Sequence, residues 1–424
     1  MENKINAVIL AAGKGTRMKS DKSKVLHEIM GKPLLGYVLD AIKKTEIIEK
    51  SYVIVGHQAE SVETYVKNTY ENAQAVLQTP QLGTGHAVSM VCPYMEDFKG
   101  EVVILCGDTP LVTAETLKAF IEHHRALNSD ITVMSAVFDD PTNYGRIIRK
   151  GENLAAIVEE KDATSAQKKI KEVNAGIYCL NWEKVKGAFS QLKNNNAQGE
   201  YYLTDIISWG VENGLNTNVY TIDDVDEIFG INSKTHLAQA SAMLKDKIIQ
   251  KHLDNGVTIV DINSVWISED TQIGADTIIF PNVYISGKNI IGKNCKIGPF
   301  AHLRGNVELG ENVKIGNYVE VKNSTIASNS NACHLSYIGD TEIGSNVNFG
   351  AGAMVANYNH FTKKKLKTII KDGVSVGGNS VLIAPVTLGE CCSIGASSVI
   401  TKDVEARSLA LTRPELKTVE NYIK

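Results

Sequence analysis

An apolar residue recurs at every sixth position through much of the C-terminal half of this chain, and glycine often follows it. Neither an α-helix, with a period of 3.6, nor a flat strand, with a period of 2, needs this spacing. A triangular solenoid does, because each side is one six-residue unit and one apolar side chain per side fills the axis. The pattern therefore predicts a β-solenoid of about seven coils over residues 257–404. The positions are Ile273, Ile279, Ile285, Ile291, Ile297, Leu303, Leu309, Ile315 and Val321, then Ile343, Phe349 and Val355, then Ile370, Val376, Leu382, Leu388, Ile394 and Ile400.

The six-residue pattern is interrupted twice, near 323–342 and near 356–369, and both interruptions are rich in polar residues. Insertions into a rigid solenoid collect on one face, which is often the binding face. The first interruption contains His334, although a lone histidine beside an aromatic residue is more often a packing or surface residue. The second contains Lys363–Lys365, although a lysine run alone is usually a solvated loop. Both segments are candidates for a binding site.

Composition limits the kinds of partner. The formal net charge of −4, without a long block of one sign, implies neither nucleic acid nor a membrane surface as a partner. The seven cysteines show no CxxC spacing, which favours free thiols in a reducing cytoplasm. No apolar run reaches transmembrane length. We expect a soluble, cytoplasmic protein.

The N-terminal half, residues 1–231, alternates apolar runs with segments of helical period, which is typical of an α/β sheet. A segment of helical spacing, 233–253, follows it and predicts a helix that joins the two halves. We therefore expect domains at 1–231 and 257–404, a linker helix within 232–256 and a tail at 405–424. The predicted strands are Ala7–Leu10, Tyr52–Val55, Val102–Leu105 and Ile131–Phe138, and the predicted helices are Leu34–Lys43 and Ala114–Ala126.

The first strand leads into a loop of small residues, Leu10-Ala11-Ala12-Gly13, followed by cationic side chains at Lys14, Arg17 and Lys24. In an open α/β sheet ligands bind at this end of the strands. Small residues let backbone N–H groups approach phosphate oxygens, and the cations add positive charge. The loop is neither GxGxxG nor a Walker A box, and alone it is as consistent with an ordinary turn.

A second loop carries Asp108, just after the strand Val102–Leu105. A carboxylate near a phosphate-binding loop is well placed to hold Mg²⁺. The alternative is an aspartate that only caps a turn. The first loop favours the metal-binding interpretation.

These features occur within longer motifs. They resemble those of the bacterial bifunctional N-acetylglucosamine-1-phosphate uridyltransferase/glucosamine-1-phosphate N-acetyltransferase family over nearly the whole chain. The fold that this implies is α/β, with a Rossmann-like nucleotidyltransferase domain followed by a left-handed parallel β-helix of hexapeptide repeats. The motifs that carry the resemblance are Lys-Val-Leu-His at 24–27, Gln-Thr-Pro-Gln-Leu-Gly-Thr-Gly-His-Ala at 78–87, Tyr-Gly-Arg-Ile at 144–147, Ile-Val-Glu-Glu-Lys-Asp-Ala at 157–163, Asn-Ala-Gly at 174–176, Gly-Glu-Tyr-Tyr-Leu-Thr-Asp at 199–205 and Gly-Ile-Asn at 230–232.

The resemblance implies uridylyl transfer from UTP to N-acetylglucosamine 1-phosphate, with release of pyrophosphate. Such a step depends mainly on positioning and charge neutralisation rather than on a covalent nucleophile. Arg17 would neutralise pyrophosphate charge and Lys24 would hold the phosphates. The remaining implied residues are Leu10, Ala11, Ala12 and Gly13 at the nucleotide, Gln78, Gly83 and Thr84 at the uracil end, Gly145, Glu159 and Asn174 at the sugar, and Asp108 with Asn232 at Mg²⁺.

For the solenoid, the resemblance implies acetyl transfer from acetyl-CoA to the amine of glucosamine 1-phosphate. His334 would act as the general base. The family also implies a homotrimer whose subunits share this site. The substrate-binding residues would be Arg304, Lys322, Tyr337, Asn348, Asn357, Tyr358 and Lys365, and the coenzyme-binding residues would be Ala351, Gly378, Ala396 and Arg413.

The chain departs from the family pattern in three places. The solenoid is shorter, with coils lost between Val283 and Gly298. A turn that is usually Asn-Tyr-Asp-Gly is Asn-Tyr-Asn-His at 357–360, with about two residues inserted before Lys365. Gly378 stands where the family often has a side chain near the coenzyme. Two other functions remain open at this point: a monofunctional nucleotidyltransferase whose solenoid only trimerises it, and a non-catalytic ligand sensor.

Overall fold

The computed structural model describes residues 4–151, 153–420 and 422. The chain divides into two compact units, residues 1–241 and 242–424, which we describe separately. The last residues of the predicted tail, 421, 423 and 424, lie outside the described residues. Within the described residues no helix combines the length and the apolar character needed to cross a membrane.

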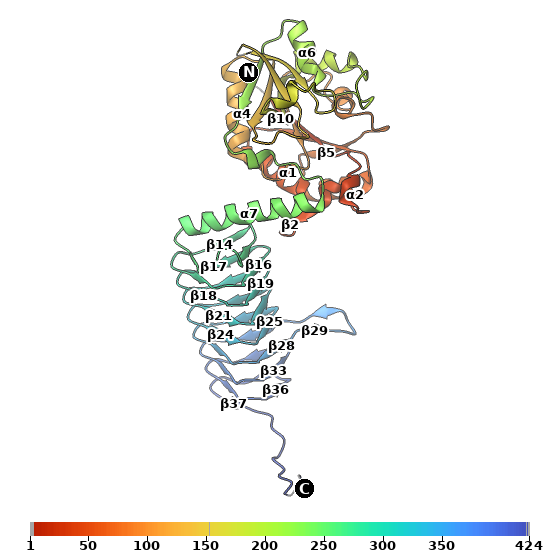
Figure 1. The fold of residues 1–424 in the computed structure, drawn as a ribbon. Helices are drawn as coiled ribbons and strands as arrows, with labels where there is room; N and C mark the ends of the chain where they lie inside the picture. Colours follow the sequence, from red (N-terminus) through yellow and green to blue (C-terminus); the bar gives the residue numbers. More distant parts are fainter. Residues whose placement is uncertain (1–3, 152, 421, 423–424) are drawn as a thin grey trace. The chain divides into compact units, whose positions relative to one another are not determined.

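The N-terminal unit is built on one mixed sheet, and every strand and helix predicted there is present with boundaries within a few residues (Figure 1). Its main strands are β1 (Ile5–Leu10), β4 (Lys50–Val55), β5 (Ala73–Leu77), β6 (Glu101–Cys106), β7 (Ile131–Val137), β10 (Glu172–Asn181) and β11 (Thr217–Thr221). Their order is β11-β7-β10-β6-β1-β4-β5, and β10 is antiparallel to both of its neighbours. A hairpin of β8 (Arg146–Lys150) and β9 (Asn153–Val158) pairs with β10 through Val173 and Arg146.

Helices cover both faces of this sheet because the strands are apolar on both sides. In β1, Ile5, Ala7 and Ile9 pack into one buried cluster, and Val8 packs into the other. The first cluster includes α1 (Leu34–Thr45), α2 (Ala59–Thr69) and α4 (Ala114–Ala126). The second includes α3 (Thr84–Ser89), α5 (Trp182–Val185) and α6 (Asp205–Glu212). Burial on both faces fixes the strands and leaves their carboxyl ends to carry loops.

Helix α7 (Lys234–Asp254) lies within the segment where the sequence predicts a linker helix. The boundary between the two units falls inside this helix, between Ser241 and Ala242. Its first residues contact the N-terminal unit, where Lys234 Nζ lies 3.1 Å from His27 Nδ1.

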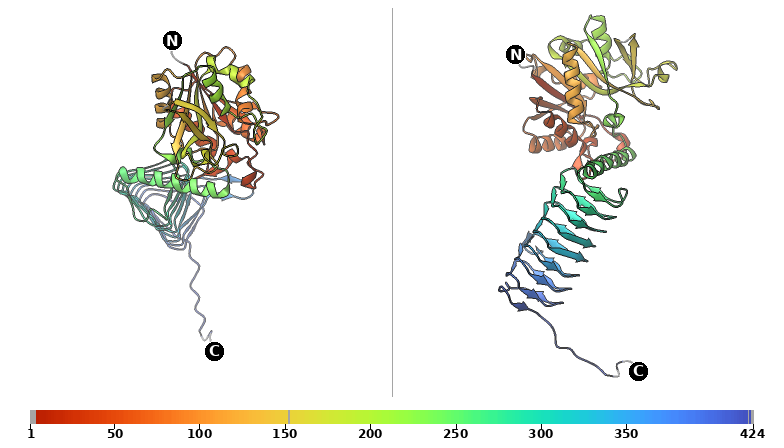
Figure 2. Two further views of the ribbon diagram at one scale, coloured as in Figure 1. Left: turned by 45° about the horizontal axis from the view of Figure 1, so that its top comes forward. Right: turned by 90° about the vertical axis from the view of Figure 1, so that its left-hand side faces the viewer.

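The C-terminal unit is a parallel β-helix of triangular cross-section (Figure 2). Three parallel sheets form its sides, and the seven strands of the third sheet close seven coils. The first sheet has β12 (Thr258–Ile259), β15 (Ile278–Ile279), β18 (Lys296–Ile297), β21 (Lys314–Asn317), β24 (Asn331–His334), β27 (Asn348–Phe349), β32 (Ser375–Val376), β35 (Ser393–Ile394) and β37 (Leu409–Ala410). The second has β13 (Trp266–Ile267), β16 (Tyr284–Ser286), β19 (His302–Arg304), β22 (Glu320–Lys322), β25 (Tyr337–Gly339), β28 (Met354–Ala356), β33 (Val381–Ile383) and β36 (Val399–Ile400). The third has β14 (Thr271–Ile273), β17 (Asn289–Ile291), β20 (Val307–Leu309), β23 (Ser324–Ile326), β26 (Thr341–Ile343), β31 (Thr368–Ile370) and β34 (Val386–Leu388).

The apolar residues of the six-residue pattern stack along the axis. Ile285 pairs with Leu303, and Leu303 pairs with Val321 one coil further on. All three side chains are buried. This is the stacking that the spacing predicts, and burial of these aliphatic side chains forms a core that needs few aromatic residues.

The first predicted interruption, 323–342, is wrong as an insertion. The buried residues continue through it as Ile326, Ala332 and Ile338, and three strands, β23, β24 and β25, occupy the segment. The pattern only loses register, because the steps from Val321 to Ile326 and from Ile338 to Ile343 are one residue shorter than six. The shortening is visible in the ladder, where Ile326 pairs with Ile343.

The second predicted interruption is an insertion, as expected. Between Val355 and Ile370 the chain leaves the solenoid as a hairpin of β29 (Tyr358–Asn359) and β30 (Lys364–Lys365), which projects as an arm (Figure 1). The hairpin and both shortened steps lie at one corner, where the chain passes from the second sheet to the third. We call this edge the Lys322 corner. Three successive coils are therefore altered at the same edge.

Candidate active sites

The first candidate site lies at the carboxyl ends of β1, β4 and β6. These strands are parallel neighbours, so the loops that follow them meet at one edge of the sheet. Backbone bonds tie the loops together: Gly107 N donates to Leu10 O at 3.0 Å, and Ala11 N donates to Ile54 O at 2.9 Å. Gln81 Nε2 donates to Ala12 O at 2.9 Å. Leu10, Ala11 and Ala12 are thus held firmly, whereas Gly13 is exposed.

Lys24, Asp108 and Asn232 converge at this edge. Lys24 Nζ lies 2.5 Å from Asp108 Oδ2 and 3.1 Å from Asn232 Oδ1. The backbone fixes this geometry, because Ile231 N donates to Asp108 O at 2.9 Å. Gly15, at φ 58°, has no room for a side chain, since a Cβ would lie 2.8 Å from Lys24 Cβ. Sequence reasoning had selected all three polar side chains, and the fold brings them together.

The oxygen atoms of Asp108 and Asn232 fit a magnesium ion. Both approach one cationic group, so both face the same point. Carboxylate and amide oxygens suit Mg²⁺, which usually takes one or two protein ligands together with water and substrate phosphates. Among the described residues no group of three or more His, Cys, Asp and Glu side chains is arranged to hold a metal. Two protein oxygens would leave the other positions around such an ion to water and substrate phosphates.

The segment that carries Gln78, Gly83 and Thr84 packs against residues 201–203. Gln78 Nε2 donates to Gly83 O at 3.0 Å and lies 3.1 Å from His86 Nδ1. Leu203 N donates to Thr84 Oγ1 at 3.0 Å. Gly83 has φ 114°, a value that disfavours other residues, and a Cβ there would collide with the backbone at Tyr201. The two motifs that most resemble the family thus support each other structurally.

Gly145, Glu159 and Asn174 lie close together in the N-terminal unit. A Cβ placed on Gly145 would lie 3.5 Å from Glu159 Oε2 and 3.6 Å from Asn174 Cβ. Asn174 N donates to Gly145 O at 2.9 Å. Burial raises the pKa of the Glu159 carboxyl, and a hydrogen bond from Thr204 Oγ1 at 3.2 Å opposes that rise. Because Gly145 has no side chain, there is space beside the Glu159 carboxyl and the Asn174 amide.

Sequence reasoning missed Arg146, whose side chain binds the sequence neighbours of Gly145 and Glu159. It is 1% exposed and donates to Tyr144 O and, at 2.6 Å, to Glu160 Oε2. Tyr144 and Glu160 are sequence neighbours of Gly145 and Glu159. The Tyr-Gly-Arg-Ile motif could have indicated this role, since an arginine next to apolar residues at the start of a strand is buried only with a partner for its charge.

Arg17, by contrast, is exposed and makes no ion pair within the part of the chain that the structure describes.

The second candidate site lies at the Lys322 corner. Lys322 follows Arg304 by one coil in the second sheet, and the base of the hairpin brings Lys365 beside it. The hydrogen bond and charge of Lys365 lower the pKa of the Lys322 ammonium, and the charge of Arg304 adds to this effect. Arg304, Lys322 and Lys365 thus bring three cations to one edge, and such a group is suited to binding an anion such as a phosphate.

Tyr337 and Asn357 meet at Gly339. A Cβ on Gly339 would collide with the Tyr337 hydroxyl and would lie 2.7 Å from Asn357 Nδ2. Tyr358 stands next to Asn357 and pairs with Lys365 across the hairpin. Glycine at 339 therefore lets two polar side chains reach the edge where the cations lie.

Sequence reasoning also missed Glu320, which accepts from Arg304 Nη1 at 2.7 Å. This bond raises the pKa of the Arg304 guanidinium. Glu320 pairs with Tyr337 in the second sheet. The sequence could have revealed Glu320, because residues one coil apart stack in a solenoid and Glu320 precedes Tyr337 by one coil.

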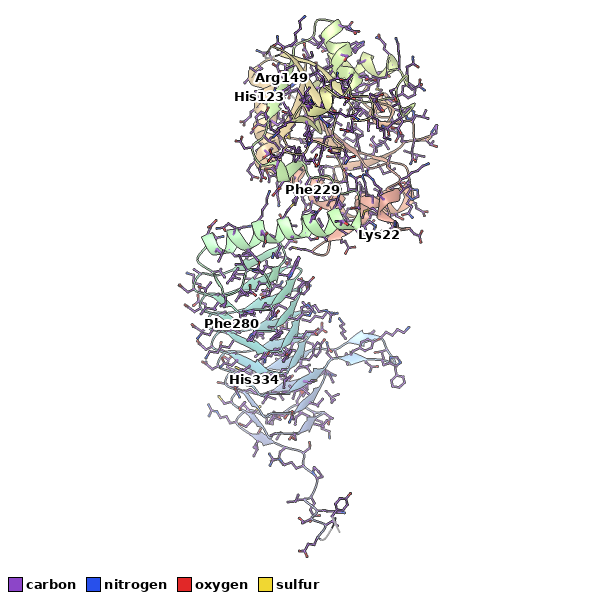
Figure 3. All side chains as sticks on the ribbon, viewed as in Figure 1. Lys22, His123, Arg149, Phe229, Phe280 and His334 are labelled. Atoms are coloured by element: carbon purple, nitrogen blue, oxygen red, sulfur yellow. The ribbon has the colours of Figure 1, made fainter. Side chains whose placement is uncertain are left out.

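His334 lies at a different corner, where the chain turns from the first sheet to the second (Figure 3). We call this edge the His334 corner. The histidine is exposed, and its imidazole has no hydrogen-bond partner among the described residues. Its backbone carbonyl accepts from Ser336 Oγ at 2.8 Å and from Gly352 N at 3.2 Å. Tyr337 separates it from the Lys322 corner on the same face.

The predicted coenzyme residues continue the His334 corner through later coils. Asn379 N donates to Ala351 O, and Ser397 N donates to Gly378 O, each at 2.8 Å, so these turns stack directly. A Cβ on Gly395, next to Ala396, would lie 3.4 Å from Arg413 Nη2. Asn348 is exposed in the first sheet and pairs with Asn331 of β24. One edge of the solenoid therefore carries His334, Ala351, Gly378, Ala396 and Arg413 in succession.

Comparison with known proteins matches both units. Residues 6–226 match the family model described as nucleotidyl transferase, and residues 290–323 and 367–402 match that of bacterial transferase hexapeptide repeats. The bifunctional protein GlmU of Geobacillus thermodenitrificans is 42% identical over 451 residues, which cover 98% of this chain and 97% of that protein. That of Clostridioides difficile is 42% identical over 452 residues, with 99% and 97% covered. That of Bacillus licheniformis is 44% identical over 450 residues, with 98% and 97% covered.

This chain belongs to the GlmU family. Membership confirms the resemblance seen in the sequence and the fold class that it implied. The alignments with GlmU relatives are longer than the 424 residues of this chain, so those proteins contain positions with no counterpart here. Loss of solenoid coils would produce such a difference. Family membership does not by itself place individual residues in the sites, and their placement follows from the geometry described above.

Proposed function

We propose that this protein makes a nucleotide sugar in two steps at two separate sites. The enzyme acetylates glucosamine 1-phosphate with acetyl-CoA and then transfers a uridylyl group from UTP to N-acetylglucosamine 1-phosphate, releasing pyrophosphate. The observation that carries the proposal is that one chain assembles both sets of side chains, at the edge of the N-terminal sheet and along the second sheet of the solenoid. Membership of the bifunctional family supports two activities over a nucleotidyltransferase with an inert solenoid.

At the first site, the chain positions the reactants and neutralises charge. Lys24 binds phosphate oxygens, and the exposed Arg17 is free to reach the leaving pyrophosphate. Gln78 and Thr84 orient the base, while Glu159 and Asn174 hold sugar hydroxyls beside Gly145. Mg²⁺ held by Asp108 and Asn232 would supply further neutralisation of phosphate charge. Phosphoryl transfer of this kind needs in-line placement and cations rather than a covalent intermediate.

At the second site, an anion subsite holds the substrate phosphate while a base acts on the amine. Arg304, Lys322 and Lys365 bind the phosphate, and Tyr337 lies between them and His334. The free amine attacks the thioester carbonyl carbon while the His334 imidazole takes a proton from the nitrogen. The carbon–sulfur bond then breaks, and the CoA thiolate takes up that proton and leaves as the thiol. The free imidazole, with no partner among the described residues, is in a position to accept that proton.

We further propose a homotrimer. Bulky apolar side chains remain exposed on the His334 corner and its adjoining sheet, including Phe300, Tyr318 and Leu335. Exposed apolar residues gathered along one edge favour burial against another subunit. Light scattering at assay concentration should give a mass of three chains, and a stable monomer would contradict this proposal.

One coupled assay tests the two activities. Glucosamine 1-phosphate, acetyl-CoA and UTP are supplied together and then withheld one at a time, while free CoA thiol and pyrophosphate are measured. We expect CoA release without UTP, and pyrophosphate release only when both steps can proceed. Pyrophosphate release from supplied N-acetylglucosamine 1-phosphate, without CoA release from glucosamine 1-phosphate, would leave only the nucleotidyltransferase activity.

A further inference from the structure

Asp340 occupies the centre of the Lys322 corner and binds two asparagines, one from the coil before it and one from the coil after. Asn323 Nδ2 donates to Asp340 Oδ1 at 2.5 Å, and Asn357 Nδ2 donates to Asp340 Oδ2 at 2.5 Å. Asp340 itself has φ 51°, a left-handed conformation that aspartate tolerates better than most residues. One carboxylate thus links the three coils that are altered at this edge.

The carboxylate dictates which way the Asn357 amide faces. An ionised carboxylate only accepts hydrogen bonds, so the amide nitrogen and not the amide oxygen must point to Asp340. Asn357 is buried, and its backbone carbonyl accepts from Leu366 N at 2.8 Å at the base of the arm. No described residue donates to Asn357 Oδ1. The amide oxygen is therefore left as an oriented acceptor without a protein partner.

Asp340 also lies within the group of cations. Its charge favours the protonated form of Lys322 and so opposes the effect of Lys365 on the Lys322 pKa. Neutralising Asp340 would leave the cations of Lys322 and Lys365 less balanced. Asp340 therefore affects both the orientation of the Asn357 amide and the charge balance at Lys322.

We propose that Asp340 is a positioning residue for acetyl transfer, which fixes the Asn357 side chain so that its amide oxygen accepts an N–H of the substrate amine. The inference rests on the acetyl transfer proposed above. The attacking nitrogen must direct its lone pair at the thioester carbon, and an oriented acceptor for one N–H restricts its rotation. Asp340 affects kcat through Asn357 and does not itself touch the substrate.

The test is Asp340→Asn, which keeps the shape but lets residue 340 donate, so that the Asn357 amide is free to turn over. We expect kcat for acetyl transfer to fall by about tenfold or more, because misorientation of a reactant has effects of this size. The KM for acetyl-CoA should change by less than about twofold, since these groups lie away from the coenzyme edge. The matched control is Asp372→Asn, whose carboxylate accepts from Ser345 N at 2.8 Å at another corner and should leave kcat unchanged.

A double variant separates positioning from mere stabilisation. If Asp340 acts through Asn357, Asp340→Asn should slow Asn357→Ala no further than about twofold. A wild-type kcat in Asp340→Asn, or effects that multiply in the double variant, would overturn the assignment. Circular dichroism and thermal unfolding of the same preparations, compared with wild type, report whether the solenoid that carries Asp340 has folded. Wild-type protein that releases no CoA would overturn both this role and the proposed acetyl transfer, whereas an active wild type with an unaffected variant overturns only the role of Asp340.

Discussion

The ammonium nitrogen of Lys24 lies 2.5 Å from Asp108 Oδ2 and 3.1 Å from Asn232 Oδ1, so one cation joins oxygen atoms from two segments far apart in the sequence. Asp108 lies near the middle of the N-terminal unit's sequence and Asn232 near its end, yet both oxygens approach the same ammonium group. This convergence is the basis for assigning them to one metal ion, and it makes their removal informative.

Asp108→Ala should abolish uridylyl transfer and leave acetyl transfer near the wild-type rate. Loss of charge neutralisation at a phosphoryl-transfer centre costs several kcal/mol, so we expect a decrease of about a thousandfold or more in pyrophosphate release. The two activities are measured separately, with N-acetylglucosamine 1-phosphate and with glucosamine 1-phosphate as substrates. Equal loss of both activities in a folded protein would contradict the existence of two independent sites.

His334→Ala should reduce acetyl transfer by about a hundredfold or more, because a positioned base contributes at least this much to deprotonation of an amine. Uridylyl transfer from supplied N-acetylglucosamine 1-phosphate should persist. CoA release is the measurement. An unchanged rate would show that His334 is only a surface residue at its corner.

Lys365→Ala should raise the KM for glucosamine 1-phosphate by about ten- to a hundredfold, which is the effect of losing one charge-assisted phosphate contact. Lys364 is the matched control, because adjacent residues of a β-strand point to opposite faces. We expect Lys364→Ala to leave this KM within about twofold of wild type. Replacement of all three lysines at 363–365 with no change in KM would mean that Arg304 and Lys322 hold the phosphate alone.

Arg146→Met should raise the KM for N-acetylglucosamine 1-phosphate and lower the stability of the N-terminal unit by about 1–3 kcal/mol, since it leaves the part-buried Tyr144 carbonyl without its donor. The control is Arg149→Met on the same strand, whose guanidinium pairs with Glu172 instead of Glu160 and is more exposed than that of Arg146. Thermal unfolding and substrate titration measure the two effects. Similar KM values in both variants would remove the role that we assign to Arg146.

His124 should make the N-terminal unit less stable in acid. Burial lowers the pKa of His124 to about 4, and Nδ1 lies 2.7 Å from Thr132 Oγ1. In the unfolded chain His124 has a pKa near 6.5. Between pH 6.5 and pH 4, therefore, the unfolded chain binds a proton at His124 and the folded chain does not. Stability therefore falls as the pH drops from 6.5 towards 4, by up to about 1.4 kcal/mol per pH unit from this group. In His124→Gln, the loss of melting temperature between pH 7 and pH 5 should be smaller than in wild type, and an identical loss would contradict this origin.

Most of the fold was predictable because its signals are local. A buried residue at every sixth position predicts a solenoid wherever it occurs, and the apolar runs of the N-terminal half predict its strands. The error over 323–342 arose because a step of five residues looks, in sequence, like a break, whereas in space the shorter corner keeps Ile326 and Ile343 paired on the third sheet. The period alone does not reveal at which corner a residue has been lost.

The sequence by itself determined the two architectures, the motifs that carry the resemblance and the identity of most candidate residues, because these depend on residue type and spacing along the chain. Only the tertiary structure decided that Lys24 contacts both Asp108 and Asn232, and that Lys365 lies beside Lys322. It also decided that Arg146, Glu320 and Asp340 contact residues of the two sites or their sequence neighbours. These contacts join side chains from separate loops, strands or coils. Their distances follow from how strands stack and where loops meet, which no short stretch of sequence encodes.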